Sequence, residues 1–336
     1  MRRTALILLI INIVGFTILY LASPLYFTRT IKVIKKSFLN INIREVSIYL
    51  SILFSCFFIE ALVMGWKRSS LYRLIRPSAT ARSDLAVAGI TVLEFSGIIA
   101  IFSTFGMSYV FPAWFKGNYR SEYLQIFDSI FLQFFVWLFV YDFLDYWYHR
   151  IMHNVGFLWE MHKFHHAATE FNIITGKRVH ILEHVFRSYF HAIPLALLGS
   201  PIEMFLSVML VRKVVDIFQH SMINWSYGWV GRWLVVSPIT HRIHHSILPE
   251  HLDKNYGNIL PIWDRIFGSW YEGDKLNDFV DAIDNPYNKN GVIHDYLLCF
   301  KLSGQRLVDS IKSNKWSLDE LELGDPLPLR SNDSKL

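Results

Sequence analysis

Nine of the fourteen histidines in this 336-residue chain fall in four short segments, and this grouping constrains the fold more than any other feature. Three segments have the patterns HRIMH (149–153), HKFHH (162–166) and HRIHH (241–245), and the fourth holds a single histidine. Residues three or four apart share one face of a helix, so each pattern can direct two or three imidazoles to one point. Since one ion does not accept nine imidazoles, we expect the four segments to meet around two metal ions. The nine residues are His149, His153, His162, His165, His166, His220, His241, His244 and His245.

The histidines alone do not identify the metal, because imidazole suits zinc, copper and iron. A structural zinc site is closed at four ligands and usually contains cysteines. The chain has only two cysteines, Cys56 and Cys299, and they lie in unrelated segments. The sequence therefore argues against a structural zinc site and against a disulfide scaffold.

Apolar runs long enough to cross a bilayer, which takes about 20 residues of helix, account for much of the 52% hydrophobic content. They cover residues 4–27, 45–66, 84–112 and 126–147, and a longer run covers 186–215. Pro194, Gly199, Pro201 and Glu203 interrupt the last run, which predicts two short helices, either a re-entrant pair or a fifth and sixth crossing. The first run is too long for a typical signal peptide, so we expect an uncleaved crossing there.

The net charge of +5 does not indicate nucleic-acid binding, because the basic residues lie beside the apolar runs. Juxtamembrane lysine and arginine usually contact lipid headgroups or set topology. The loops between the first three runs carry five basic residues each, so they do not decide the orientation. They are Arg29, Lys32, Lys35, Lys36 and Arg44 in one loop and Lys67, Arg68, Arg73, Arg76 and Arg82 in the other.

We predict an all-α protein, a multi-pass transmembrane helix bundle with a helical cap that carries a histidine-rich di-metal site. Residues 1–125 are expected to form an N-terminal transmembrane scaffold. Residues 126–275 hold every histidine pattern and are expected to form the catalytic domain. Residues 276–336 are predicted to form a polar C-terminal cap and tail, whose end after Gly324 is expected to be disordered.

Two acids precede the first histidine pattern on the same predicted helix face. Asp142 and Asp145 lie on one stripe with His149 and His153. A carboxylate near a metal-bound imidazole orients the ring and raises its basicity, so both acids are predicted to support the ligands. The aromatic cluster at 146–148 is typical of the membrane interface, which predicts metals just outside the hydrocarbon layer.

The five other histidines need separate interpretation. His180 and His184 are four residues apart and could form a further pair on spacing alone. His191 lies within an apolar run and is predicted to be a buried histidine without a metal. His251 lies in a predicted loop, and His294 is expected to be solvated.

The histidine patterns resemble those of the fatty acid hydroxylase/sterol desaturase superfamily of membrane di-iron enzymes. The resemblance rests on HRIMH, HKFHH, His220 with Asn224, and HRIHH. It extends to the segment HLDKNYG (251–257) and to WDRIFGS (263–269), and covers residues 135–272.

The resemblance implies membrane helices capped by a cytosolic helical domain that holds two iron ions and uses O2. It assigns the nine histidines as ligands and gives His180 a supporting position next to them. Some relatives have a histidine where this chain has Asn224, whose neutral amide is expected to support the site by binding a metal weakly or through water. Asp264, in WDRIFGS, is also predicted to support a ligand. No pattern of a fused cytochrome b5 domain is found in the sequence, so we expect a separate electron donor, either cytochrome b5-like or ferredoxin-like.

The function predicted from these features is O2-dependent hydroxylation or desaturation of a lipid, with an acyl chain, an alkyl chain or a sterol-like ring as substrate. A membrane transporter or metal-handling protein is one alternative, but it should place ionisable residues near mid-membrane. A di-zinc hydrolase is another, and it would need an open coordination position and a carboxylate base. The sequence does not separate hydroxylation from desaturation.

Overall fold

The computed structural model describes residues 2–39, 43–92, 128–199, 202–273 and 287–317. Within these ranges every regular element is helical, and the one β contact is an isolated bridge between Val155 and Ser317. The predicted helical class is confirmed. The helices are α1 (Arg2–Ala22), α2 (Pro24–Leu39), α3 (Ile43–Met64), α4 (Ser70–Ile75), α5 (Ala79–Val92), α8 (Ile130–Asn154), α9 (Gly156–His166), α10 (Ile181–Leu197), α11 (Ile202–Gln219), α12 (Trp229–Trp233), α13 (Pro238–His244), α14 (Ile262–Ile266) and α15 (Val292–Ser313). Single 3-10 turns lie at Trp66–Arg68, Thr175–Lys177 and Pro249–His251.

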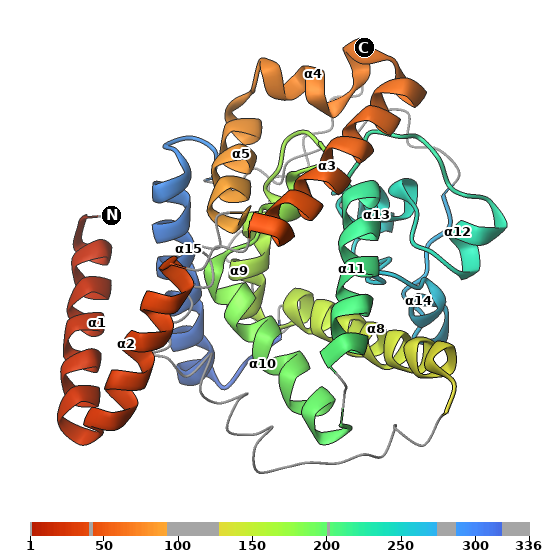
Figure 1. Ribbon diagram of the computed structural model, residues 1–336. Helices are drawn as coiled ribbons and strands as arrows, with labels where there is room; N and C mark the ends of the chain where they lie inside the picture. The colour runs from red at the N-terminus through yellow and green to blue at the C-terminus, as the bar shows by residue number, and fades with distance from the viewer. Residues whose placement is uncertain (1, 40–42, 93–127, 200–201, 274–286, 318–336) are drawn as a thin grey trace.

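The helices pack around α8 and α9, which follow one another directly (Figure 1). Helices α9, α10 and α11 all contact α8, and α15 packs along α9. Tyr148 of α8, Phe164 of α9 and Cys299 of α15 share one buried apolar cluster. The segment predicted as a C-terminal cap therefore packs, through α15, against the helices that carry the first two histidine patterns.

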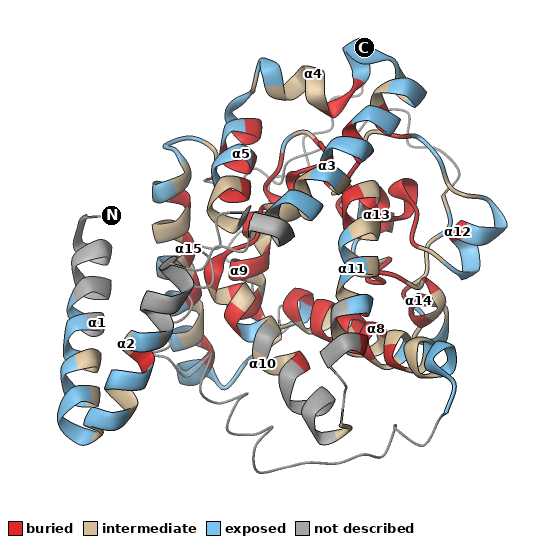
Figure 2. Cartoon of the chain, in the orientation of Figure 1, coloured by how far each residue is buried: buried red, intermediate tan, exposed pale blue. Residues whose placement is uncertain are grey.

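The helix α8 has one end in contact with the core and the other exposed (Figure 2). It begins after Ser129, whose side chain accepts a hydrogen bond from the backbone N–H of Leu132. Near this start Phe131 and Phe135 are exposed, whereas Tyr148 and Met152 at the other end are buried. An exposed apolar face on a long helix fits contact with lipid.

Two helices among the fully described residues are long and apolar enough to cross a membrane, at Ser47–Met64 of α3 and Ile130–Asn154 of α8. The glutamate within α3, Glu60, is buried and accepts hydrogen bonds from the backbone N–H groups of Ser70 and Met222. The bond from Ser70 attaches α3 to α4, and the bond from Met222 attaches α3 to the segment that follows His220. The total number of crossings stays a prediction.

The structure changes the boundaries of two predicted runs. The first run is not one helix, because α1 ends at Ala22 and α2 begins at Pro24, with Phe27 packed edge-on against Tyr20. Proline lacks the N–H that would continue the first helix. The broken run forms two helices as predicted, α10 and α11, although Pro194 lies inside α10. Only 84–92 of the third run lies in the described residues.

Candidate metal centre

A sharp turn between α8 and α9 brings the first two histidine patterns together. Val155 is the one residue between the helices, and its extended backbone interrupts the helical path and changes the direction of the chain. His149 and His153 occupy the last turns of α8, and the HKFHH pattern ends α9. The backbone N–H of Gly156 donates to the carbonyl of Trp316, which fixes the turn against the segment after α15.

The last two patterns come from the end of α11 and from α13. His220 directly follows the last residue of α11. The helix α13 begins with Pro238, and the side chain of Ser237 caps it by accepting from the backbone N–H of Thr240. Serine at the cap and proline in the first turn are both favoured at a helix start. Because α11 contacts α13, His220 and the HRIHH pattern meet.

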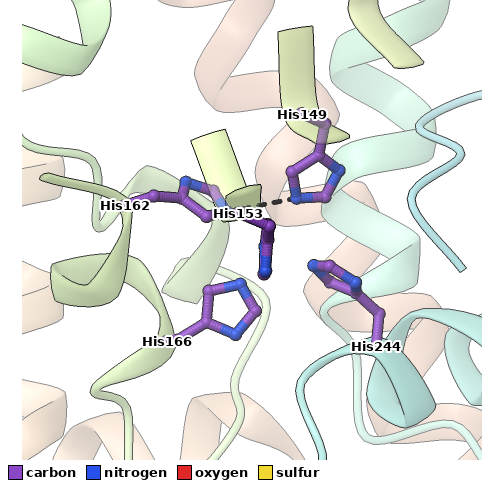
Figure 3. Close-up of side chains that lie close together, drawn as sticks. All are labelled: His149, His153, His162, His166 and His244. Atoms are coloured by element: carbon purple, nitrogen blue, oxygen red, sulfur yellow. Dashed lines mark hydrogen bonds between the residues drawn. The ribbon is translucent and has the colours of Figure 1, made fainter. Parts of the chain in front are cut away.

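All nine predicted ligands lie in two buried groups. We call them the five-histidine group and the four-histidine group, and in each the candidate ligand atoms lie within 4.8 Å of one another. The first, in Figure 3, takes side chains from α8, α9 and α13. The five-histidine group is His149, His153, His162, His166 and His244, and the four-histidine group is His165, His220, His241 and His245.

Hydrogen bonds at Nδ1 orient three rings of the five-histidine group. The Nδ1 atom of His149 lies 2.8 Å from the carbonyl oxygen of Tyr256, and that of His244 lies 2.9 Å from the carbonyl oxygen of Lys254. The Nδ1 atom of His162 lies 3.0 Å from Oε1 of Glu183. A ring that donates through Nδ1 keeps the lone pair of Nε2 for a metal. The Nε2 atoms of His149 and His162 lie 3.1 Å apart, facing the same point (Figure 3).

The four-histidine group is oriented by α11. The Nδ1 atom of His220 lies 2.7 Å from the carbonyl oxygen of Asp216 and 3.5 Å from its carboxylate. The Nε2 atom of His241 lies 2.9 Å from that of His220 and 3.2 Å from that of His245. Gly176 permits this arrangement, since a Cβ there would lie 2.9 Å from Nδ1 of His220 and 2.7 Å from Oδ1 of Asp216.

The two groups fit metal ions by the chemistry of their donors. Five buried ring nitrogens of the two groups have no hydrogen-bond partner among the described residues, which is rare for buried polar atoms and is explained if these rings bind ions. Burial and the neighbouring rings hold the pKa of His166, His241 and His245 well below the ordinary value, and burial lowers the pKa of His244 to about 3. Neutral imidazole is the form that binds metal. The five atoms are Nε2 of His153, His166 and His244, and Nδ1 of His165 and His241.

The two acids on α8 do not touch the histidine groups, contrary to the role predicted for them. Asp142 accepts from the backbone N–H groups of Ile259 and Leu260 and from the indole of Trp263. Asp145 accepts from Arg212 at 2.7 Å, and Nε2 of His191 lies 3.2 Å from it. The acids share the buried side of α8 with the histidines. Asp142 binds residues 259 and 260, which follow Tyr256 in the same loop, whereas Asp145 faces side chains of α10 and α11.

Asp264 contacts the loop that orients a predicted ligand, His149. It accepts from the backbone N–H groups of Tyr256 and Gly257 at 2.7 and 2.8 Å. The carbonyl of Tyr256 is the group that faces Nδ1 of His149. Asp264 therefore fixes the loop that orients this ring without touching the ring itself.

The remaining predicted side chains lie outside both groups. The Nε2 atom of His180 lies 3.3 Å from the carbonyl of Tyr296, and its Nδ1 accepts from the backbone N–H of Leu182. The amide oxygen of Asn224 accepts from Arg242. His191 is buried without joining either group, as predicted. His184 also joins neither group, and His251 lies in a 3-10 turn.

The sequence interpretation missed Glu183 and Asp216, the two carboxylates that do approach the rings. Asp216 lies four residues before His220, and this helical spacing could have revealed it. Glu183 is 21 residues from His162, and only the packing of α10 against α9 brings them together. No short-range pattern in the sequence identifies that pair.

A cavity of about 420 Å³ lies next to the histidine groups. Its apolar lining includes Val179, Phe205 and Met209, and its polar lining includes Arg187 and Arg212. A second, water-sized space of about 20 Å³ is lined by histidines of both groups. The two spaces share Gly176, Val179, Arg187, Arg212 and Asp216, so the larger cavity adjoins the candidate metal sites.

Residues 134–269, which contain all nine histidines, match the family model described as fatty acid hydroxylase. The chain is 30% identical to human alkylglycerol monooxygenase over 148 residues, which are 44% of this chain and 32% of that protein. It is 27% identical to the ornithine lipid hydroxylase OlsE of Rhizobium tropici over 155 residues, covering 43% and 46% of the two chains. It is 25% identical to the putative Delta(7)-sterol-C5(6)-desaturase 2 of Arabidopsis thaliana over 143 residues, covering 41% and 48%.

The chain thus spans less than half the length of each of these relatives. No solved structure matches it. All three relatives fall in the superfamily that the histidine patterns resemble. Residues 134–269 are therefore similar to the fatty acid hydroxylase domain, and the relatives that they match belong to the fatty acid hydroxylase/sterol desaturase superfamily.

Proposed function

We propose that this protein is an O2-dependent, non-haem di-iron oxidoreductase that hydroxylates or desaturates a C–H bond of a membrane lipid. One observation carries the proposal: two buried groups made only of histidines lie side by side next to a cavity of about 420 Å³. The named relatives act on alkylglycerols, ornithine lipids or sterols. This favours lipid oxidation over metal transport or hydrolysis.

The nine histidines would hold one ion in each group. Iron bound there would supply the redox chemistry with O2, with electrons from a separate cytochrome b5-like or ferredoxin-like protein. The chain orients the imidazoles through the carbonyls of Tyr256 and Lys254 and the carboxylate of Glu183. Burial keeps the rings neutral and separates the site from bulk solvent.

The larger cavity is the candidate site for the lipid. Phe205 and Met209 give an aliphatic chain apolar contact, and Tyr141 lines the same space. The residues shared with the smaller space, among them Val179, mark the end nearest the histidines. A lipid in this cavity would present a C–H bond to the candidate metal centre.

We further propose the arrangement in the membrane. Residues 1–125 would form the membrane scaffold, 126–275 the catalytic domain and 276–336 the cap and tail of a multi-pass protein. All four histidine patterns would lie on one membrane face, the cytoplasmic one. The exposed start of α8 and its buried end support the placement of the histidines at one end of this helix, because only the buried end carries histidines, while the choice of the cytoplasmic face rests on the resemblance.

Lipid mass spectrometry of cells with and without the gene tests the proposed function. Expression should convert one lipid class to a product that has gained an oxygen atom or lost two hydrogen atoms, and withholding O2 should prevent the conversion. A matched strain that expresses His244→Ala should lack the product. An unchanged lipid profile under aerobic expression of folded protein would contradict the proposal.

A further inference from the structure

The small space between the two histidine groups has a polar lining that does not come only from the predicted ligands. It is about 20 Å³ in volume, and His149 and His162 line it from the five-histidine group, while His165, His220 and His241 line it from the four-histidine group. Two side-chain amides, those of Gln219 and Asn258, also line it.

Each amide has an atom without a hydrogen-bond partner among the described residues. Oε1 of Gln219 and Nδ2 of Asn258 are buried and unpaired, and the two side chains are 2% and 7% exposed. Oε2 of Glu183, which lines the same space, is also unpaired. Buried polar atoms nearly always have hydrogen-bond partners. Three unpaired atoms around one space therefore indicate a binding site for a polar ligand.

The volume limits what that occupant can be. A space needs about 10–15 Å³ to hold one water molecule, which then requires two to four polar partners. The small space meets this requirement and leaves no room for a lipid chain, which the adjoining cavity of about 420 Å³ accommodates. The amides provide an acceptor and a donor for a single water-sized ligand.

Both amides are held by well-anchored backbone. Gln219 is the last residue of α11 and directly precedes His220. Asn258 lies between Gly257, whose N–H donates to Asp264, and Ile259, whose N–H donates to Asp142. Such anchoring preserves the orientation of the two side chains towards the space, whichever ligand occupies it.

We propose that Gln219 and Asn258 hold a water-sized ligand between the two ion sites, with Oε1 of Gln219 accepting from it and Nδ2 of Asn258 donating to it. The inference rests on the proposed di-metal function and adds two side chains that bind no metal. A half-turn of either amide exchanges its oxygen and nitrogen, so the pair can also serve an anionic ligand.

Azide, a small anion that binds exposed iron, is a suitable probe for the purified, iron-loaded full-length protein. Gln219→Leu and Asn258→Leu should leave the iron content unchanged and should each raise the azide Kd about tenfold, since each removes a hydrogen bond to a charged ligand. Gln219→Glu should raise it further, because a carboxylate repels azide. Asn154→Leu, an exposed amide at the end of α8, is the matched control and should bind azide like the unaltered protein.

Azide titration monitored by visible absorption, together with iron analysis, measures the azide Kd and the iron content of each variant and so tests the inference. An unchanged azide Kd at full iron content would overturn the inference, and so would loss of iron from both leucine variants, because the amides would then support the ligands instead. If the leucine variants do not fold, Gln219→Asn and Asn258→Ser shorten the side chains and carry the same expectation. Unaltered protein that binds no iron would instead refute the proposed function, and the inference with it.

Discussion

Glu183 faces His162 across 3.0 Å, from its Oε1 to the ring Nδ1, and both side chains are buried. Because that nitrogen donates to the carboxylate, the other ring nitrogen is directed into the five-histidine group. We predict that Glu183→Gln, which removes the charge but keeps the size, weakens metal binding or activity by about 10–100-fold. Metal titration of the purified variant measures this effect. Glu160→Gln, a buried glutamate paired with Lys163, is the control and should bind metal normally; equal affinity in the two variants would show that Glu183 does not support the site.

Asp145 supports the fold more directly than the metal. It is fully buried and pairs with Arg212 at 2.7 Å and, more distantly, with Arg187 at 3.9 Å. Removing one partner of a buried ion pair leaves an uncompensated charge, so Asp145→Asn should lower the free energy of unfolding by about 3–5 kcal/mol. Thermal unfolding in detergent tests this, with the exposed Asp309→Asn as control.

The protein that remains folded in the Asp145→Asn sample should hold its normal amount of metal, because no hydrogen bond joins Asp145 to either histidine group. A stable variant that loses metal would contradict this assignment and would restore the role expected from the sequence.

The stability of the iron-free protein should fall as the pH falls from neutrality. Burial lowers the pKa of His244 to about 3 and keeps those of His241 and His245 well below the ordinary value of about 6.5. At pH values between the lowered pKa of these histidines and their ordinary pKa, the unfolded chain binds more protons than the folded chain. The free energy of unfolding therefore decreases as the pH falls through this range. The Tm of iron-free protein should be lower at pH 5.5 than at pH 7.5. An equal or higher Tm at pH 5.5 would show that the rings are solvated.

The topology can be tested with single cysteines in a background without Cys56 and Cys299. Asn154→Cys and Glu250→Cys should react with an impermeant reagent from the same side of sealed vesicles, because both positions lie near histidine patterns. Asp128→Cys, just before α8, should react from the opposite side if α8 crosses the bilayer. Labelling of positions 154 and 250 from opposite sides would rule out a single catalytic face.

The helical class could be predicted from the apolar runs and from spacing within single helices. The meeting of the histidine patterns could be predicted because nine imidazoles require more than one ion. The division into five and four could not. His165 and His166 are adjacent on α9, and a helix turns about 100° per residue, so they join different groups. Only the positions of α8, α11 and α13 around α9 decide which group each ring enters.

The carboxylates that contact the histidines also could not be predicted from sequence spacing alone. Asp142 and Asp145 have the predicted spacing from His149, yet their partners are Ile259 and Arg212, which are far away in sequence. Spacing places a side chain on a helix face but does not identify the segment that covers that face. Glu183 is too far from His162 in the sequence for spacing to relate the two residues. Asp216 lies four residues before His220, but this spacing is common in helices and does not by itself identify a carboxylate that orients a ligand.

The proposed function requires that two iron ions in the histidine groups use O2 to oxidise a lipid. The most direct test is O2 uptake by purified protein of known metal content, supplied with a chemical reductant and a lipid extract. We predict two irons per chain and lipid-dependent O2 uptake. Both should be reduced in His165→Ala and His244→Ala, while the helix content by circular dichroism is unchanged. Two zinc ions per chain with lipid hydrolysis, or full iron content without lipid-dependent O2 uptake, would contradict it.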